Sequence, residues 1–347
     1  MSRTYYDEIL RPVLEFSNIH HEMFVTDSPV YIENFIKKLD LESAQYTDFV
    51  VIGGDGMFSQ LINSITKHPD RENLLKLPIG IIPGGSSNAL ACDLSCKDPC
   101  QAVINIVKGT TVKCDMFELH TNDTGLRLYS SALTYGFPVD LSIESENMRN
   151  TFGRYRYVAC GIKRLLSTRP ILYDAEIFYK TEEDDLIESV HSKPKFKKLG
   201  SKDDTKISRK TSRNLEIKTK KSKEGKWNKL TFDNKFLFAA VVTHEIRSSI
   251  NNEVFAPYAK LGEGNMYLAG VKRLNRLDAL TYVQRASKNT QVTYEKYFYK
   301  KVTELRFKCP EGSNFCVDGE AYKSNDFSIK LLPHFVTLFG KKDHIKF

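Results

Sequence analysis

Apolar and polar positions in the first third of the chain follow two periodicities. Apolar side chains three or four positions apart predict amphipathic helices, whereas short apolar runs and strict alternation predict strands. The two kinds of segment alternate along the chain as helix 5–16, strand 20–27, helix 31–41, strand 49–52, helix 57–67 and strand 77–83. Strands that alternate with helices predict an α/β domain built on a parallel sheet.

The pattern changes after about residue 110. The later segments are rich in β-branched and aromatic residues, which favour strands. One helical segment, 276–287, interrupts strand-like segments at 125–137, 171–180, 236–246, 265–272, 303–309 and 327–339. We therefore expect an α/β domain with a parallel sheet over residues 1–112 and an antiparallel β-sandwich domain over residues 113–347.

Positive charge is concentrated in one segment. Residues 191–230 hold 15 Lys and Arg against 4 Asp and Glu, a net charge of +11 in a chain of +8, so the rest is at −3. Because this segment has few apolar residues and no hydrophobic periodicity, it is predicted to be a disordered insertion. It is either a solvated loop or a tether to an anionic membrane surface. Nucleic acid is not an expected partner, because the segment has no interleaved aromatic residues.

The cysteines and the N-terminal residues indicate the cellular compartment of the protein. Seven cysteines without paired spacings favour a reducing environment. The first ten residues lack the apolar core of a signal peptide, and no run approaches the ~18 apolar residues of a membrane span. We expect a cytoplasmic protein with peripheral membrane contact.

Two glycine-rich turns each follow a predicted buried strand and precede a helix. They read FVVIGGDG at 49–56 and PGGSSNAL at 83–90. Glycines let the backbone approach a ligand closely, and a helix N-terminus offers unpaired N–H donors that suit phosphate. The two turns therefore predict one phosphate-binding cradle at the carboxyl edge of the sheet. Neither matches the dinucleotide or the P-loop signature.

Asp55 is unexpected in such a cradle, because a carboxylate repels phosphate. Phosphoryl transfer gives it a role, either as proton acceptor for an attacking hydroxyl or in holding the Mg²⁺ of a nucleotide. The alternative is that Asp55 caps the helix that begins near Gly56.

The order of these motifs resembles one enzyme family. The GGDG and PGGSSNALA turns, residues 125–157 and the stretch FCVDGEAY at 315–322 resemble the diacylglycerol, ceramide and sphingosine lipid kinases, and the sphingosine kinases most. The resemblance implies ATP and Mg²⁺ as cofactors, a lipid-binding β-sandwich domain and an active site in the crevice between the domains. It also implies that the C-terminal segment returns to the first domain.

The resemblance also implies roles for individual residues. Asp55 matches the general base for the lipid hydroxyl, and Asp140 and Glu146 match acids near the polar lipid head group. Positions implied to contact the nucleotide or its phosphates are Thr26, Gly53, Gly54, Gly56, Gly84, Gly85, Ser86, Asn88, Arg149, Arg156, Asp318 and Glu320.

Three departures from the family pattern leave alternatives open. The family's first strand and its Asn-Pro-containing phosphate loop are not in this sequence, Gln60 stands where a Glu is usual, and Ser142 replaces an acid that binds the sphingoid head group. We expect an ATP-dependent kinase that phosphorylates the primary hydroxyl of a sphingoid base. A ceramide or diacylglycerol kinase, or a non-catalytic lipid-binding protein, are the alternatives.

Overall fold

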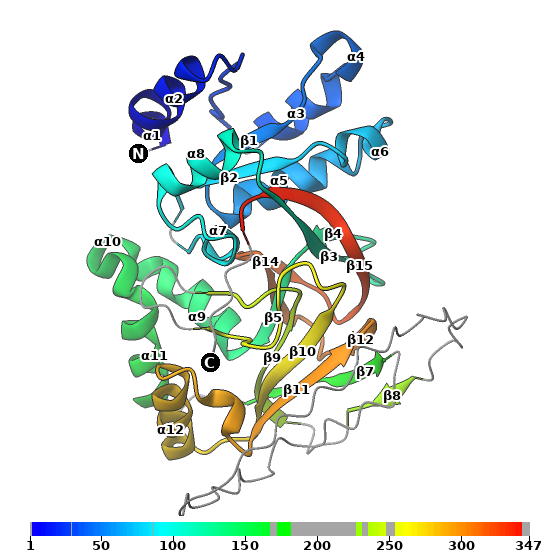
Figure 1. The fold of residues 1–347 in the computed structure, drawn as a ribbon. Coiled ribbons are helices and arrows are strands. Elements are labelled where there is room, and N and C mark those ends of the chain that lie inside the picture. Colours follow the sequence, from blue (N-terminus) through cyan, green and yellow to red (C-terminus); the bar gives the residue numbers. More distant parts are fainter. Residues whose placement is uncertain are drawn as a thin grey trace, which may run out of the picture.

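The computed structural model describes residues 2–28, 30–85, 87–166, 172–181, 227–230, 235–247 and 254–341. Figure 1 shows a smaller α/β unit above a larger unit of β-strands, with a group of helices along one side of the latter. Among these described residues, no helix is both long and apolar enough to cross a bilayer.

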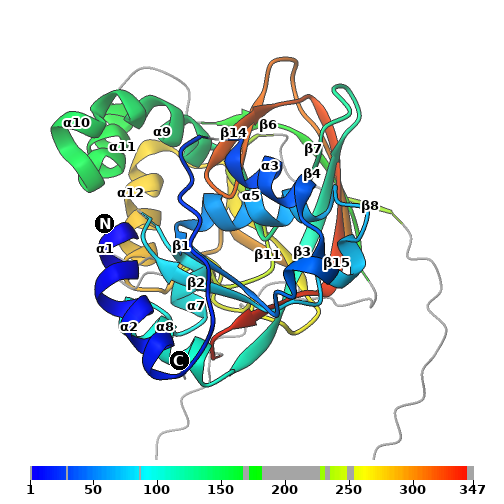
Figure 2. The ribbon, with the colours of Figure 1, turned by 90° about the horizontal axis from the view of Figure 1, so that it is seen from above.

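The α/β unit is built on two parallel strands, β1 (Phe49–Gly53) and β2 (Ile79–Pro83). Seen from above, α5 and α8 lie on opposite sides of these strands (Figure 2). Apolar side chains from both layers meet in one buried core, which includes Phe58, Ile62 and Ile82. The helical segments of this unit are α1 (Ser2–Tyr5), a π-helical turn (Tyr6–Leu10), α2 (Arg11–Phe16), α3 (Tyr31–Lys38), α4 (Leu41–Ala44), α5 (Asp55–Ile65), α6 (Arg71–Leu74), α7 (Ala89–Asp93) and α8 (Pro99–Val107).

The larger unit holds two sheets of mainly antiparallel strands. One continues from β1 and β2 of the α/β unit in the order β1-β2-β15-β12-β7-β8, with β3 beside β15 and β4 beside β3. The other has the order β11-β10-β9-β5-β13-β14, with β6 beside β9. A second core fills the space between them. The strands are β3 (Thr111–Thr121), β4 (Arg127–Ser130), β5 (Ala132–Gly136), β6 (Tyr173–Asp174), β7 (Glu176–Lys180), β8 (Asn228–Lys229), β9 (Lys235–Val242), β10 (Met266–Lys272), β11 (Tyr297–Val302), β12 (Glu304–Lys308), β13 (Asn314–Val317), β14 (Glu320–Lys323) and β15 (Asp326–Phe339).

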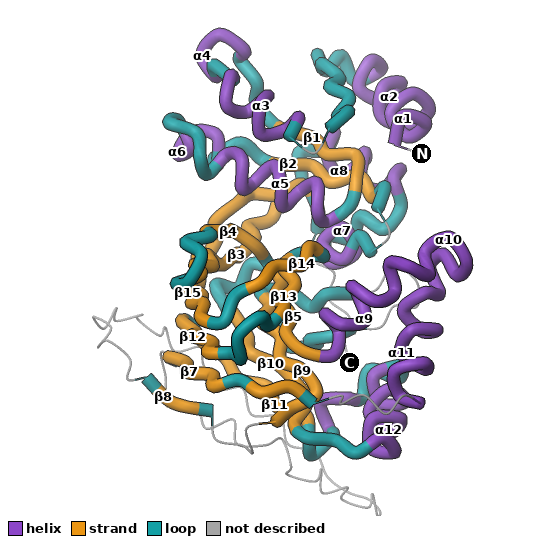
Figure 3. Tube along the Cα trace, turned by 180° about the vertical axis from the view of Figure 1, so that it is seen from behind, coloured by secondary structure: helices purple, strands orange, loops and turns teal. Residues whose placement is uncertain are grey.

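Four helices line one side of the β-sheet unit (Figure 3). They are α9 (Phe137–Ser145), α10 (Arg149–Phe152), α11 (Arg156–Leu166) and α12 (Arg276–Ala286). The expected fold class, a parallel-sheet α/β domain followed by an antiparallel β-sheet domain, is confirmed.

Strand β15 connects the two units. Over most of its length β15 pairs antiparallel with β3, and Leu338 near its end pairs parallel with Ile79 of β2. The end of the described chain therefore completes the sheet of the α/β unit. The exact domain boundary at residue 112 stays a prediction, because β3 runs through it.

Two local expectations need correction. Residues 20–27 form no strand, since Met23, Phe24 and Val25 are 41%, 43% and 59% exposed and the segment has no buried face to pair against a sheet. Of the basic segment 191–230, residues 227–230 include β8, which pairs with β7. The remainder of that segment lies outside the described residues.

Leu338 is fully buried where β2, β3 and β15 meet. Leu338→Ala should lower the free energy of unfolding by about 2–5 kcal/mol, because it leaves a cavity in the α/β core. Urea unfolding measures this loss. Leu277→Ala is the control, since Leu277 is 76% exposed, and its effect should stay within about 0.5 kcal/mol. Equal effects of the two changes would contradict the connecting role of β15.

Candidate active site

The two glycine turns lie against each other. The Gly84 N–H donates to the Gly53 carbonyl at 2.9 Å. A Cβ on Gly85 would lie 2.5 Å from the Gly54 Cα, closer than real Cβ atoms approach another heavy atom. The contact therefore requires glycine at Gly85 and disfavours a side chain at Gly54, whose Cβ would lie 3.1 Å from the Gly85 Cα.

Asn88 closes the second turn. Its side-chain oxygen accepts from the Gly85 N–H and its amide donates to the Gly85 carbonyl, both at 2.8 Å. Its φ of +52° is in the left-handed region, which Asn tolerates better than most residues. Ser86 lies outside the described residues.

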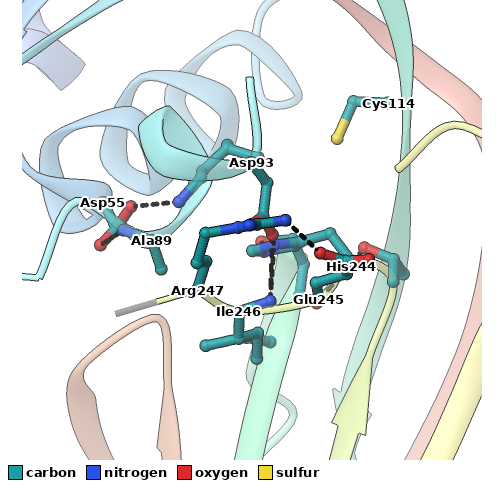
Figure 4. Close-up of polar contacts among 12 residues, drawn as sticks. Asp55, Ala89, Asp93, Cys114, His244, Glu245, Ile246 and Arg247 are labelled. Atoms are coloured by element: carbon teal, nitrogen blue, oxygen red, sulfur yellow. Dashed lines mark hydrogen bonds and ion pairs between the residues drawn. The ribbon is translucent and has the colours of Figure 1, made fainter. Parts of the chain in front are cut away.

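Asp55 links the two turns through hydrogen bonds. It is the first residue of α5, yet its carboxylate accepts the backbone N–H groups of Ala89 and Leu90 at 3.0 and 3.1 Å (Figure 4). Asp55 therefore caps α7 and not the helix that it begins. The expectation that α7 presents these N–H groups to a phosphate is wrong in this structure, because the positive end of α7 already binds the nearest anion.

The hairpin of β13 and β14 brings two further acids to the start of α5. Asp318 and Gly319 form its two-residue turn with φ of +46° and +96°, as a type I′ turn requires. Asp318 accepts from the Ala132 N–H at 3.2 Å and from the Ser131 hydroxyl at 3.5 Å. A Cβ on Gly56 would lie 3.9 Å from a carboxylate oxygen of Glu320.

The environment of Asp318 disfavours its charge. Burial raises its pKa to about 6, and hydrogen bonds from Ser130 and Ser59 only partly offset this. The negative charge of Asp55 raises the pKa of Asp318 further, whereas His244 lowers it. Burial, together with the negative charge of Asp55, creates a place where a cation, or a proton, is favoured.

A buried polar network stands behind these acids, and the sequence analysis missed it. Asp93, the last residue of α7, lies 2.6 Å from Nδ1 of His244 and accepts from the backbone N–H of Ile246 and from Nε of Arg247 (Figure 4). The other ring nitrogen of His244 lies 3.2 Å from the Ser131 hydroxyl, next to Asp318. The network thus links α7 to the β13–β14 turn.

The charges in this network are paired. Burial lowers the pKa of His244, but the hydrogen bond to Asp93 and the charge of Asp93 have a larger effect. The pKa of His244 is therefore raised overall. Arg247 is 1% exposed and also donates to Glu245 at 2.5 Å. The signal in the sequence is the stretch THEIR at 243–247, in which four polar residues directly follow the apolar strand β9.

The acids expected at the lipid head group are each paired with an arginine. Asp140 accepts from Arg164 at 2.6 Å and from the Tyr173 hydroxyl. Glu146 pairs with Arg156 at 2.7 Å, and Arg156 is only 7% exposed. The implied roles of Asp140, Glu146 and Arg156 stay predictions.

Thr26 and Arg149 are two further residues implied to contact the nucleotide. Thr26 is in the irregular segment before α3, and no hydrogen bond within the described part of the chain joins it to the glycine turns. Arg149 begins α10, and its side chain is outside the description.

Comparison with known proteins indicates the class of protein to which this site and fold correspond. A model of the diacylglycerol kinase catalytic domain matches residues 2–119. Over most of its length the chain is similar to sphingosine and ceramide kinases.

Particular relatives share low identity over most of the chain. Sphingosine kinase 1 of Arabidopsis thaliana is 25% identical over 87% of the chain, which spans 60% of that protein. Sphingosine kinase 1 of Caenorhabditis elegans is 23% identical over 95% of the chain and 76% of its own length. Mouse ceramide kinase is 24% identical over 81% of the chain and 54% of its own length. A diacylglycerol kinase structure from Bacillus anthracis shares the fold, with a TM-score of 0.61, 15% identity and coverage of 98% of this chain and 92% of that one.

Asp318→Asn tests the electrostatics of the site. Because the folded pKa of about 6 exceeds the ordinary 3.8, Asp318 contributes stability at low pH that is lost as pH rises through about 6. Asn cannot ionise, so the stability of the variant relative to wild type should rise by about 1–3 kcal/mol between roughly pH 4 and 7. Urea unfolding at several pH values measures this trend.

Asp326→Asn is the matched control, because the pH dependence of its relative stability should have the opposite sign. The hydrogen bond from Arg306 lowers the pKa of Asp326. This variant should therefore lose relative stability as pH rises through the ordinary carboxyl range. A pH-independent difference for Asp318→Asn would contradict the burial that raises the pKa of Asp318.

Proposed function

We propose that the protein is an ATP-dependent lipid kinase that phosphorylates the primary hydroxyl of a sphingoid base. The observation that carries the proposal is the position of Asp55, held by two backbone N–H groups between the glycine turns and beside the Asp318 hairpin. The similarity to sphingosine kinases along most of the chain supports the substrate class.

Asp55 is the proposed general base. A carboxylate oxygen has more than one acceptor direction, so each oxygen that binds an α7 N–H group can still accept a hydroxyl proton. The two N–H bonds fix the orientation of the carboxylate, which a base needs in order to meet the hydroxyl in line with the phosphate. With ATP bound, the lipid hydroxyl would give its proton to Asp55 as its oxygen forms a bond to the γ-phosphorus. The bond from that phosphorus to the β–γ bridging oxygen would break and release ADP.

ATP and Mg²⁺ are the proposed cofactors. The backbone at Gly56 leaves room for phosphate groups, because a Cβ there would meet nothing closer than a carboxylate oxygen of Glu320 at 3.9 Å. Asp318 and Glu320 would face the bound metal, since Mg²⁺ commonly uses one or two carboxylates together with substrate phosphates. Bound Mg²⁺ supplies charge neutralisation for the transferred phosphoryl group.

A ceramide or diacylglycerol kinase is the second candidate. The Arg164–Asp140 pair favours it, because the acid that would attract a sphingoid amine already holds a cation. Ser142 removes a further negative charge from the same helix. Both features weaken selection for a positively charged head group.

We also propose a cytoplasmic location with peripheral attachment to membranes. The seven unpaired thiols and the charge distribution along the sequence support this placement. A lipid kinase must reach a substrate that resides in a bilayer.

Asp55→Asn should reduce lipid phosphorylation by roughly 10²–10⁴-fold, because Asn cannot accept the proton. It should also lower the free energy of unfolding by about 1 kcal/mol through loss of one capping bond. Labelled ATP in an assay with the full chain, and urea unfolding, measure the two effects.

Asp98→Asn is the matched control for the capping loss. Asp98 caps α8 by accepting from the Cys100 N–H at 2.9 Å, on the exposed surface. It should lose similar stability and keep full activity. Normal turnover by Asp55→Asn would refute the assigned base.

The substrate class is tested by turnover of sphingosine, ceramide and diacylglycerol in mixed micelles. The proposal expects the highest kcat/KM for the sphingoid base. Preference for ceramide or diacylglycerol would replace the first candidate by the second. Failure to bind ATP with Mg²⁺ and to use any of the three lipids would leave a non-catalytic lipid-binding protein.

A further inference from the structure

Helix α7 is too short to be stable without contacts to the rest of the protein. It comprises only Ala89–Asp93, and isolated helices of this length do not persist in water. Its first N–H groups donate to Asp55, whereas Asp93 at its end is 5% exposed and binds the β-sheet unit. Because a helix rises about 1.5 Å per residue, these two contacts are only about 6 Å apart along the axis. A displacement of Asp93 is therefore passed directly to the N–H groups that orient Asp55.

The partners of Asp93 lie in a turn directly after β9 (Figure 4). The shortest of its contacts is with Nδ1 of His244, at 2.6 Å, and the N–H of Ile246 and Nε of Arg247 donate at 3.0 and 3.4 Å. Ile246 has a φ of +52°, which is rare for a β-branched residue. Such a strained conformation persists only where the surrounding structure holds it. The turn is thus bent so that a ring nitrogen and a backbone N–H reach the same carboxylate oxygen.

Other contacts hold α7 against the α/β unit. Leu90 and Ala91 pack in its apolar core. The carbonyl of Leu94, one residue after the helix, accepts from the Lys341 N–H at 2.9 Å. Apolar packing has no preferred direction, whereas a hydrogen bond depends on angle as well as distance. The directional bonds at Asp93 therefore set the position of α7 relative to the β-sheet unit.

His244 also contacts the part of the β-sheet unit that carries Asp318. Its Nε2 lies 3.2 Å from the Ser131 hydroxyl, and that hydroxyl donates to Asp318 at 3.5 Å. His244 is 2% exposed, so both ring nitrogens are shielded from water. The ring therefore connects the end of α7 with the β13–β14 turn.

We propose that His244 is a positioning residue for phosphoryl transfer: its contact with Asp93 holds α7 where the helix orients Asp55. His244 acts through Asp93 and α7 and not by contact with the reacting atoms. The inference rests on the proposed function, because it takes Asp55 as the general base. The competing view is that His244 only stabilises the buried network, without effect on the turnover of folded protein.

Two substitutions at His244 separate its two contacts. Asn places its amide nitrogen as many bonds from Cβ as Nδ1, so it can still donate to Asp93. Gln places its amide nitrogen as many bonds from Cβ as Nε2, so it keeps a group near Ser131 and loses the contact with Asp93. Both variants remove the buried ring, and the loss of packing is therefore matched.

Steady-state kinetics of the full chain with labelled ATP and sphingosine in mixed micelles compare the two variants. His244→Gln should lower kcat by about tenfold to hundredfold, because a small displacement of the base is costly. Its KM values for ATP and lipid should stay within about threefold of wild type, since the change removes no contact to either substrate. His244→Asn should restore kcat to within about threefold of wild type, because it keeps the bond to Asp93.

The Asp55→Asn background shows whether His244 acts through Asp55. In that background His244→Gln should change the residual turnover by less than about twofold, because the group that it positions is absent. A merely structural role would lower turnover by the same factor in both backgrounds.

Amide hydrogen exchange follows α7 independently of activity. In His244→Gln the N–H groups of Ala89 and Leu90 should exchange about tenfold faster than in His244→Asn, because the helix has lost its directional contact with the β-sheet unit.

Asp93→Ser breaks the same contact from the other side and keeps the inference testable if His244→Gln does not fold. The Ser hydroxyl ends closer to the backbone than the carboxylate and cannot reach His244. Arg247 keeps Glu245 as its counter-ion, which limits the cost of the change. This variant should show the same loss of kcat with little change in KM.

Equal kcat values for His244→Gln and His244→Asn would overturn the inference and leave Asp55 as the base. An equal loss in the wild-type and Asp55→Asn backgrounds would overturn it as well, as would an unchanged kcat in folded Asp93→Ser. Normal turnover by Asp55→Asn would instead refute the proposed function together with this inference. That result is obtained without any change at His244, so the two failures are distinguishable.

Discussion

The contact between the Asp55 carboxylate and the first N–H groups of α7 determines the geometry of the site. It fixes the start of α5 against the start of α7, and the glycine turns that precede both helices are pressed together as a result. A side chain on Gly85 would force the turns apart. The same contact orients the Asp55 carboxyl group where the α/β unit faces the β13–β14 turn.

The two units are joined by buried polar contacts as well as by β15. Asp93 ends the same short helix that Asp55 caps, and it binds His244, Ile246 and Arg247 from the β-sheet unit. Removing one partner from such a network leaves a buried charge without compensation, which costs far more than an exposed pair contributes. The position of α7, and with it that of Asp55, therefore depends on both units.

Local features of the site could be predicted from the sequence. The glycine turns, Asp55 and the Asp318-Gly319 hairpin depend on short motifs whose backbone requirements are visible in the residues themselves. The Asp93–His244 contact could not be predicted, because its partners lie 151 positions apart. The strand expected at 20–27 failed for a related reason: alternation forms a strand only where a neighbouring strand and a buried face exist. The pairing of Glu146 with Arg156 likewise depends on how α11 turns back beside α9, which no short pattern encodes.

The central claim is that Asp55 faces the hydroxyl that is phosphorylated. A crystal structure of the full chain with a non-hydrolysable ATP analogue, Mg²⁺ and sphingosine tests it most directly. The account predicts the primary hydroxyl oxygen about 2.6–3.2 Å from an Asp55 oxygen, with Ala89 and Leu90 still donating to the carboxylate. A hydroxyl that lies beyond hydrogen-bond reach of Asp55, with phosphate oxygens in place of the carboxylate at the start of α7, would contradict it.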